Sequence, residues 1–360
     1  MNQKKKTVAI FCFSDGIGGM EHDAVKLASR LSEQADVVLA CKKNSPIERL
    51  YKEGHFSFLC VPILFSSRTF SVSMLYCVRK LLHRYAPENV IFFGASELKT
   101  LFFAFLGFNI NLLIRHGTTK SNPKSDWFHR LIYSRVNYHI ALSKHLLNNV
   151  RKIVPFSSTV KYRIIYPSFE LAVGDVPIDK SDRIINIVHV GRVVEGKGQI
   201  DAVYACRQLS KNSIAFDFNI LGGFGSASYL SDLRREVSEN NLEGCVHLRD
   251  HVSNVDDYLR SADIFLFPSA GEGMPNAFIE AMYYGVVCIA YNNTVFPEFL
   301  EMGFHLHIVE NADMEELAKT LIRVAENLQA EKELASANVA LVERFFNQER
   351  ELSDWDKVLR

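Results

Sequence analysis

The sequence predicts an α/β protein built from two parallel sheets. Its 360 residues are enough for two domains. Apolar runs of strand length alternate with segments of helical period, which is typical of βαβ units. These runs fall into two sets, and the segment between them, 165–183, contains two prolines, a glycine and clustered polar residues. Each set is about the size of one Rossmann-like sheet.

Twelve strands are predicted, six in each set. The first six lie at 7–13, 36–40, 57–61, 89–93, 110–115 and 137–141, and the second six at 185–190, 215–221, 245–248, 263–267, 286–290 and 305–309. The domains predicted from them are an N-terminal one over 1–168, a linker over 169–183, a C-terminal one over 184–340 and a last helix over 341–360 that crosses back to the first. We expect these two domains to face a deep cleft. Because ligands of parallel sheets bind beyond the carboxyl ends of the strands, the strand ends are where binding residues are expected.

The composition is that of a globular protein, since 48% hydrophobic and 23% charged residues leave apolar material for two cores. Seven cysteines, an odd number without a C-x-x-C pair, predict neither a disulfide framework nor a zinc cluster and fit a reduced, cytoplasmic compartment. The apolar run after the basic start breaks at Ser14 and Asp15, which indicates a buried strand instead of a secretion signal. The longest apolar stretch, 101–114, is too short to span a bilayer.

Charge is divided unevenly along the chain. Residues 1–170 contain 24 Lys and Arg against 11 Asp and Glu, whereas residues 171–360 contain 17 against 30. The basic half suits an anionic acceptor or the anionic inner face of the cell membrane, and the alternative is that opposite charges help the domains approach each other. One segment, 68–85, has the pattern of an amphipathic helix, whose commoner fate is to pack on its own sheet with a solvated basic face. Its basic residues are Arg68, Arg79, Lys80, His83 and Arg84, and its apolar residues are Val72, Leu75, Val78 and Leu82.

Two predicted strand ends carry glycines and cations. "GRVVEGKG", 191–198, begins with Gly191 and contains Arg192 and Lys197, and "LGGFG", 221–225, contains Gly222. Arginine can bind a phosphate through two parallel hydrogen bonds, and lysine acts as a mobile point charge. The loop therefore indicates a diphosphate clamp, although by itself it could also be a solvated basic loop.

A third strand end continues into "PSAGEGMPNAFIEAMYYG", 268–285. Pro275 suits the first turn of a helix, so the backbone N–H groups near Asn276 and Ala277 should form a seat for an anion. Glu272 before the helix and Glu280 within it would then bind neutral hydroxyl groups beside the phosphates. A nucleotide sugar supplies this order of groups: ribose, diphosphate and hexose.

"GRVVEGKG" followed by "ADIFLFPSAGEGMPNAFIEAMYYG" resembles the donor-binding half of the family-four (group 1) retaining glycosyltransferases of GT-B fold. The N-terminal half resembles them more weakly, through "DGIGGME", "IRHG", "ALSKHL" and "IIYPSFE", the last standing where the family has an Asn-Gly turn. The resemblance implies that Arg192 and Lys197 hold the diphosphate, that Glu280 binds the ribose, that Glu272 faces the donor sugar, and that His116 contacts this sugar from the other domain. The implied catalytic residues are His116, Arg192, Lys197 and Glu272; the implied donor-binding residues are Gly18, Gly19, Gly191, Arg192, Lys197, Gly222, Gly273, Met274, Pro275, Asn276, Ala277 and Glu280.

The resemblance further implies transfer of a hexose from a nucleotide diphosphate-sugar, UDP-sugar being favoured over GDP-sugar, to a hydroxyl of a glycan or glycolipid. The setting would be synthesis of a bacterial-type polysaccharide, lipopolysaccharide or lipid-linked glycan, with no nucleic acid as partner. Two alternatives stay open: a catalytically silent nucleotide-sugar binding subunit, and an epimerase or phosphorylase of GT-B fold.

Neither a dinucleotide nor a metal is expected. Gly16, Gly18 and Gly19 are followed by Glu21 where a dinucleotide fingerprint needs a third glycine, which leaves them to the donor phosphates or the acceptor. The single D-x-D, Asp354 and Asp356, lies in a predicted helix, where residues two apart point to different sides. No ligand spacing links the candidate histidines, which are His189, His247 and His251.

Transfer with retention of the anomeric configuration requires little base catalysis from the protein. If the acceptor hydroxyl attacks on the face that the diphosphate leaves, the departing phosphate can take its proton, and Glu272 then positions the donor. The competing mechanism, with Glu272 as covalent nucleophile and Glu280 as its partner, requires both carboxyl groups to flank one bond.

Overall fold

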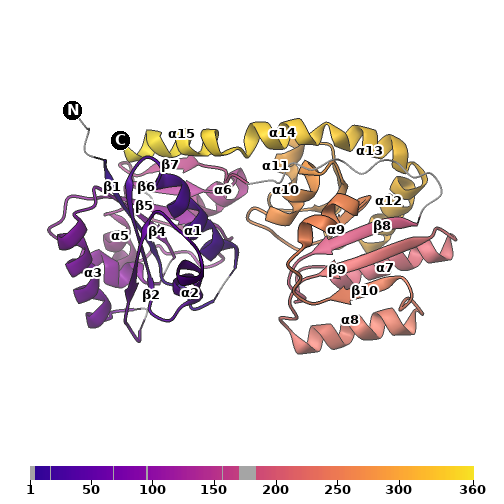
Figure 1. Ribbon diagram of the computed structural model, residues 1–360, viewed down its shortest axis with the longest axis horizontal. Coiled ribbons are helices and arrows are strands. Elements are labelled where there is room, and N and C mark those ends of the chain that lie inside the picture. The colour runs from indigo at the N-terminus through magenta and orange to yellow at the C-terminus, as the bar shows by residue number, and fades with distance from the viewer. Residues whose placement is uncertain (1–4, 17, 68, 95, 156, 170–183) are drawn as a thin grey trace. The chain divides into compact units, whose positions relative to one another are not determined.

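The computed structural model describes residues 5–16, 18–67, 69–94, 96–155, 157–169 and 184–360. It contains two parallel sheets flanked by helices, so the predicted α/β class with two Rossmann-like domains is confirmed (Figure 1). The chain divides into two compact units, one of Met1–Ser168 with Gln348–Arg360 and one of Phe169–Asn347. No helix among the described residues is both long and apolar enough to cross a membrane.

The sheet of the first unit has seven strands in the order β3-β2-β1-β4-β5-β6-β7, and all neighbours are parallel. They are β1 (Thr7–Cys12), β2 (Asp36–Lys42), β3 (Leu59–Ile63), β4 (Asn89–Phe93), β5 (Asn111–His116), β6 (Tyr138–Ala141) and β7 (Lys161–Ile164). The strand order reverses between β1 and β4. In such sheets, the carboxyl ends at this switch point form the usual ligand site.

Helices cover both faces of this sheet (Figure 1). They are α1 (Gly19–Leu31), α2 (Pro46–Glu53), α3 (Val72–Tyr85), α4 (Leu98–Ala104), α5 (Trp127–Tyr133), α6 (Lys144–Ile153) and α15 (Gln348–Leu359). Four of these helices have a side-chain cap, in which the side chain accepts a hydrogen bond from a backbone N–H group of the first turn: Ser45, Ser71, Asp126 and Ser143. The N–H groups of a first turn have no partner within the helix itself. One core packs α1 and α15 on the sheet, and the other packs α3, α4 and α5.

The amphipathic segment predicted over 68–85 is the helix α3. Arg68 lies outside the described residues. Val78 and Leu82 are buried against the sheet, as the pattern predicts. Val72 is 80% exposed, so its assignment to the apolar face was wrong. It is the first helical residue after the cap Ser71, and at this end of the helix its side chain faces solvent.

The predicted helix over 341–360 is two helices. The first, α14 (Asn338–Phe345), belongs to the second unit, and α15 belongs to the first. The break follows from Phe346, which is 1% exposed and packs on Phe169, Phe299 and Phe304. Burying this ring takes its backbone out of helical geometry, with φ −123° and ψ 26°.

The α15 helix is held on the first unit by a buried ionic network. Glu351 is fully buried; it accepts from Arg30 at 3.0 Å and from the backbone N–H and hydroxyl of Ser168 at 2.9 and 2.7 Å. Arg115, 3.6 Å from the same carboxylate, also donates twice to Asp23. Such a network holds the helix in one register because Arg30, Arg115 and Glu351 are buried charges, each with a defined partner.

The sheet of the second unit has six strands in the order β10-β9-β8-β11-β12-β13, again all parallel. They are β8 (Ile185–Val190), β9 (Phe216–Leu221), β10 (Val246–Arg249), β11 (Ile264–Phe267), β12 (Val287–Asn292) and β13 (His307–Glu310). Besides α14, its helices are α7 (Gln199–Lys211), α8 (Ala227–Glu239), α9 (Val255–Ser261), α10 (Asn276–Tyr283), α11 (Phe296–Glu301), α12 (Met314–Glu326) and α13 (Leu328–Ser336). The strand order reverses between β8 and β11, where the glycine-rich loops begin.

All twelve predicted strands are present, with ends within two residues of the prediction. The sequence pattern missed β7, an edge strand with the sequence KYRI, whose residues are exposed or half-buried in alternation. A strand with so little apolar burial has a weak period-two signal. Of the predicted linker over 169–183, residues 170–183 lie outside the described residues.

Candidate active site

Two glycines let the loops at the switch point of the second unit touch. At Gly222, φ is +140° and an added Cβ would lie 2.3 Å from the carbonyl oxygen of Gly191. At Gly198, φ is +73° and an added Cβ would lie 1.9 Å from the carbonyl oxygen of Pro268. Any larger residue would clash with backbone, so the loops after β8, β9 and β11 are locked against one another.

This contact brings together Lys197 and Glu272. The Lys197 Nζ lies 2.6 Å from Oε1 of Glu272, and the side chains are 25% and 13% exposed. The backbone N–H of Glu272 donates to Thr294 Oγ1 at 2.9 Å. The site therefore holds a lysine and a carboxylate that were predicted from separate motifs, and each remains accessible to a ligand.

Ser269 supports this pair and was not singled out from the sequence. It is fully buried, and its hydroxyl lies 2.7 Å from Glu272 Oε1 and 3.2 Å from the carbonyl oxygen of Gly196. Asn293 donates to its backbone oxygen at 2.9 Å. Its position two residues after β11, in "PSAGEG", was the available signal, because side chains at strand ends border ligand sites in parallel sheets.

The α10 helix begins directly after the Glu272 loop. Pro275 is its N-cap, with φ −84° and ψ 102°, one position earlier than the predicted first turn. The first i to i−4 bond runs from the N–H of Ile279 to the oxygen of Pro275 at 3.2 Å. The N–H groups of Asn276 and Ala277 thus precede the hydrogen-bonded part of the helix, where anions are favoured. The half-buried Glu280 lies further along the same helix, and Gly273 and Met274 are half-buried on the loop before it.

Arg192 follows Gly191 and is exposed. Gln199 donates to its carbonyl oxygen at 3.0 Å, which holds the backbone of the loop. Over the part of the chain that the structure describes, no carboxylate pairs with its guanidinium. Its charge is therefore available to an anion, whereas that of Lys197 is already shared with Glu272.

His189 lies in the core beneath this loop and is fully buried. Its Nδ1 lies 3.0 Å from the carbonyl oxygen of Leu266, so Nδ1 carries the proton and donates. Burial lowers its pKa to about 4, and the nearby Lys197 acts in the same direction, so the ring is neutral. Its Nε2 has no hydrogen-bond partner among the described protein atoms.

The first unit has its own pocket of about 230 Å³. It lies at the carboxyl ends of β1, β4 and β5, which is the switch point of this sheet. Its lining includes Ser14, Glu97, Arg115, His116 and Lys120. This is where an α/β sheet of this order binds a ligand, and it contains the predicted residue His116.

His116 is 2% exposed, and its Nε2 lies 2.9 Å from Nδ1 of His139. Burial, with the neighbouring His139, holds the pKa of His116 well below its usual range. Burial also lowers the pKa of Lys120 to about 8, and Asn149 holds the backbone of that lysine at both its N–H and its oxygen, at 2.9 Å each. The pocket thus contains a neutral histidine beside a lysine that loses its proton more readily than an exposed lysine does.

The predicted donor-binding glycines of the first unit lie at the start of α1. Gly18 is its N-cap with an extended φ of −172°, which any residue can adopt, and a Cβ at Gly19 would meet no atom within 4 Å. The fold therefore does not require glycine at either position, and the backbone there is open to approach. Glu21, which stands in place of a third fingerprint glycine, is buried in the first turn.

The groups considered for metal binding have other partners. Asp354 pairs with Arg350 and Lys357 of the same helix, α15, at 2.9 and 2.8 Å, and Asp356 pairs with Arg360, which directly follows α15. His247 pairs with Asp217 at 2.7 Å. A cluster that the sequence reasoning missed contains His305, His307 and Glu331; its signal was the H-x-H spacing at the start of a strand.

Residues 185–327 match the family model described as "Glycosyl transferases group 1". One similar curated protein is the amylovoran biosynthesis glycosyltransferase AmsK of Erwinia amylovora, which is 31% identical over 46% of this chain and 42% of its own length. Another is the putative colanic acid biosynthesis glycosyltransferase WcaL of Escherichia coli K12, which is 31% identical over 40% of this chain and 37% of its own length. This chain thus spans about two-fifths of the length of the curated relatives it matches. A crystal structure of Anabaena Alr3699/HepE in complex with UDP and glucose has a TM-score of 0.81 at 16% identity and covers 98% of this chain and 99% of its own, which shows the same fold.

Proposed function

We propose that this chain, a member of the group 1 glycosyltransferases of GT-B fold through its domain at residues 185–327, transfers a hexose from a UDP-sugar. The acceptor would be a hydroxyl of a growing polysaccharide or lipid-linked glycan, and the anomeric configuration of the hexose would be retained. The observation that carries this proposal is the Lys197–Glu272 pair, held between three strand ends beside the start of α10. The polysaccharide setting is supported by the relatives AmsK and WcaL.

The diphosphate of the donor would lie between Arg192, Lys197 and the first N–H groups of α10. Lys197 would then exchange its carboxylate partner for a phosphate oxygen, and Arg192 would bind a second one. Glu280 would accept hydrogen bonds from the ribose, and the released carboxylate of Glu272 would bind hydroxyls of the hexose. UDP as the nucleotide is supported by the UDP and glucose in the crystals of the structural neighbour HepE.

Transfer proceeds by attack of the acceptor hydroxyl on the anomeric carbon from the side of the leaving group. The bond between this carbon and the diphosphate oxygen breaks, and that oxygen takes the hydroxyl proton as its own charge develops. Arg192, Lys197 and the α10 N–H groups stabilise this charge, so the mechanism needs no metal ion.

The acceptor partner proposed for the first unit is held at an anionic membrane surface. We assign to this surface an apolar patch made of Phe70, just before α3, Val72 and Tyr76 of α3, and Trp127 and Leu131 of α5; Val72 and Trp127 are 80% and 75% exposed. Phe128 of α5 connects α5 to the segment before α3, since its ring lies 5.8 Å from those of Phe70 and Trp127.

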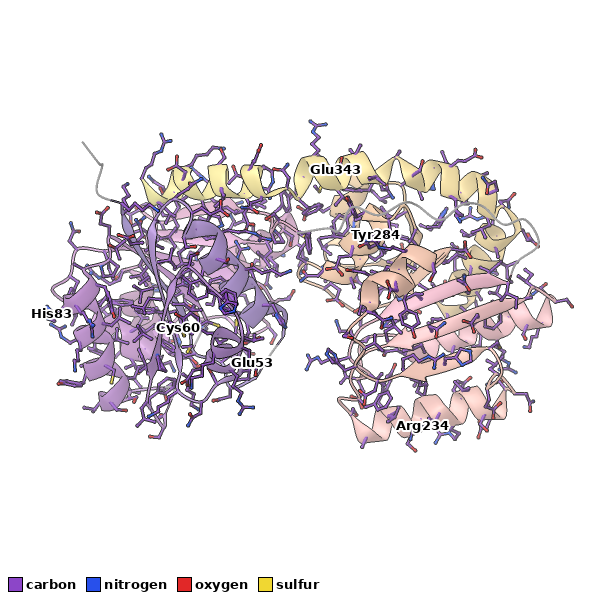
Figure 2. The ribbon with its side chains drawn as sticks, viewed as in Figure 1. Glu53, Cys60, His83, Arg234, Tyr284 and Glu343 are labelled. Atoms are coloured by element: carbon purple, nitrogen blue, oxygen red, sulfur yellow. The ribbon has the colours of Figure 1, made fainter. Side chains whose placement is uncertain are left out.

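Basic residues extend this patch. Val72, Tyr76, Lys80 and His83 follow one another along one side of α3, and all four are exposed. Figure 2 labels His83 on this helix. The helices α3, α4 and α5 contain no Asp or Glu. The exposed carboxylate of Asp126, directly before Trp127, caps α5 and pairs with His129. Apolar side chains beside the cations of α3 suit insertion among anionic headgroups.

Sedimentation with vesicles tests this part of the proposal. The wild type should pellet with phosphatidylglycerol vesicles at low salt, less at high salt, and not with neutral phosphatidylcholine vesicles. W127S with Y76S should lose the pelleting, whereas the exposed second-unit variant K211A should keep it. Equal recovery in the supernatant with both lipids would reject the membrane partner.

Donor specificity and turnover test the central proposal. In a panel of UDP-, GDP- and ADP-sugars, a UDP-sugar should raise the melting temperature most, because a bound ligand stabilises the folded state by mass action. UDP release should then be measured with polyprenyl-diphosphate-linked glycans as acceptors. Donor binding without turnover on any acceptor would favour the silent subunit, and turnover that needs no acceptor would favour an epimerase.

A further inference from the structure

Three potential metal ligands converge in the second unit, away from the donor loops. Nε2 of His305 and Nε2 of His307 each lie 2.9 Å from the same oxygen, Oε2 of Glu331. The three ligand atoms lie within 4.8 Å of one another. Among the described residues, no other group of three histidines, cysteines or carboxylates is as close.

The backbone holds the two histidines on one side of an extended segment. Phe304 and Leu306 alternate with them and are 3% and 6% exposed, so the imidazoles point to the opposite face. Asn338, fully buried, donates to the oxygen of His305 and accepts from its N–H, at 2.8 Å each. One ligand is thereby positioned before any ion binds.

We propose that His305, His307 and Glu331 form a binding site for one divalent cation of the zinc type, with a fourth position open to water. Two imidazole nitrogens and a carboxylate oxygen suit Zn²⁺ and its neighbours Co²⁺ and Ni²⁺, whereas Mg²⁺ prefers oxygen ligands. With metal–ligand bonds of about 2.0–2.1 Å in a tetrahedron, ligand atoms are roughly 3.3 Å apart. Each histidine–glutamate separation would therefore lengthen by about 0.4 Å on coordination, and the two histidine nitrogens, which lie within 4.8 Å of each other, would take up the same spacing.

The site would stabilise the unit and take no part in transfer. His307 begins β13, whereas the loops with Lys197 and Glu272 follow the carboxyl ends of strands parallel to it, at the opposite edge of the sheet. Glu331 belongs to α13, which continues through α14. A bound ion would join α13 to the amino end of β13.

Titration of the full chain with Zn²⁺ tests the proposal, using protein without a polyhistidine tag, with its thiols kept reduced. One equivalent should bind and raise the melting temperature, while Mg²⁺ should do neither. H307A and E331Q should weaken Zn²⁺ binding more than about 10-fold. H247A, which removes a histidine paired with a single carboxylate, should bind like the wild type.

Co²⁺ provides a second measurement that does not depend on variant stability. The wild-type Co²⁺ complex should show ligand-field bands of a nitrogen and oxygen site without the near-ultraviolet band of thiolate ligands. A thiolate band, absence of stoichiometric binding, or equal affinity of folded E331Q and wild type would overturn the proposal and leave the cluster a hydrogen-bonded contact. Because UDP binding should be unchanged by Zn²⁺, failure here leaves the proposed function untouched.

Discussion

Lys197 and Glu272, 75 positions apart in the sequence, form an ion pair of 2.6 Å at the edge of the second sheet. Both side chains are partly exposed, so the pair stabilises the fold by no more than about 1 kcal/mol. A doubly charged diphosphate can therefore displace Glu272 from Lys197 at little cost. We interpret the pair as a placeholder that keeps both side chains in position for the donor.

The two glutamates of the site should separate in binding experiments. E280A should weaken UDP binding by roughly 1.5 to 3 kcal/mol, because charge-assisted hydrogen bonds to the ribose are lost. E272A should leave UDP affinity equal or higher, since it frees Lys197 for the phosphate, and should instead lower transfer and discrimination among donor sugars. Calorimetry with UDP, combined with transfer kinetics, measures both effects.

The exposed α8 variant E239A is the control and should behave like the wild type. Equal loss of UDP affinity in E280A and E272A would show that the roles are wrongly assigned. A glycosyl adduct trapped on Glu272 would establish the covalent mechanism instead.

K197A should reduce kcat about 100- to 1000-fold, because the ammonium acts mainly on charge that develops as the diphosphate leaves. The melting temperature should change little, since this side chain lies on a loop and contributes one weak pair. Steady-state kinetics and thermal unfolding check this, with K211A at the exposed end of α7 as the matched control. An unchanged kcat would remove Lys197 from the diphosphate site.

Transfer should persist in EDTA, and D354N/D356N should retain full activity. The two aspartates already pair with arginine and lysine side chains in and directly after α15, and the donor site supplies its own positive charge. Initial rates should be measured after dialysis against chelator and again after adding Mg²⁺ or Mn²⁺. Complete loss of activity that either ion restores would exclude the metal-free mechanism.

E351A should destabilise the first unit by about 3 to 5 kcal/mol, because it leaves the buried charge of Arg30 without its carboxylate. E351Q, which keeps a polar partner for Ser168, should cost less. Urea unfolding followed by tryptophan fluorescence reports on this unit, since both tryptophans, Trp127 and Trp355, belong to it. D354A, which breaks only surface pairs, should stay within about 1 kcal/mol of wild type.

His189 should make the second unit sensitive to acid. Its pKa is about 4 in the folded chain, below the 6.5 of an unperturbed histidine. Between these values the unfolded state binds a proton that the folded state does not, so the free energy of unfolding decreases as pH falls through this window. From pH 7 to pH 5 the loss is about 2 kcal/mol.

Urea unfolding followed by circular dichroism at both pH values, for wild type and H189N, measures this contribution. The variant should lose about 2 kcal/mol less than the wild type over the same interval. The same pH dependence in both proteins would show that the proton binds elsewhere.

Local patterns were sufficient for much of this protein. Buried strands such as β1 and β11 appear as continuous apolar runs, because both of their faces are covered by helices. Arg192, Lys197 and Glu272 could be proposed because polar residues directly after such strands reach the carboxyl edge of the sheet. β7 could not be predicted, since its half-exposed residues lack this signal.

The sequence by itself determined the α/β class, the twelve strands with strong apolar patterns and the loops that carry the candidate chemistry, because these depend on the periodicity of neighbouring residues. Only the tertiary structure decided which distant side chains meet. The Lys197–Glu272 pair, the burial of Ser269, the end of α14 at Phe346 and the convergence of His305, His307 and Glu331 depend on how strands, loops and helices pack. Such contacts have no short-range signature, since the free energy that selects them comes from burial and charge pairing between segments far apart in the chain.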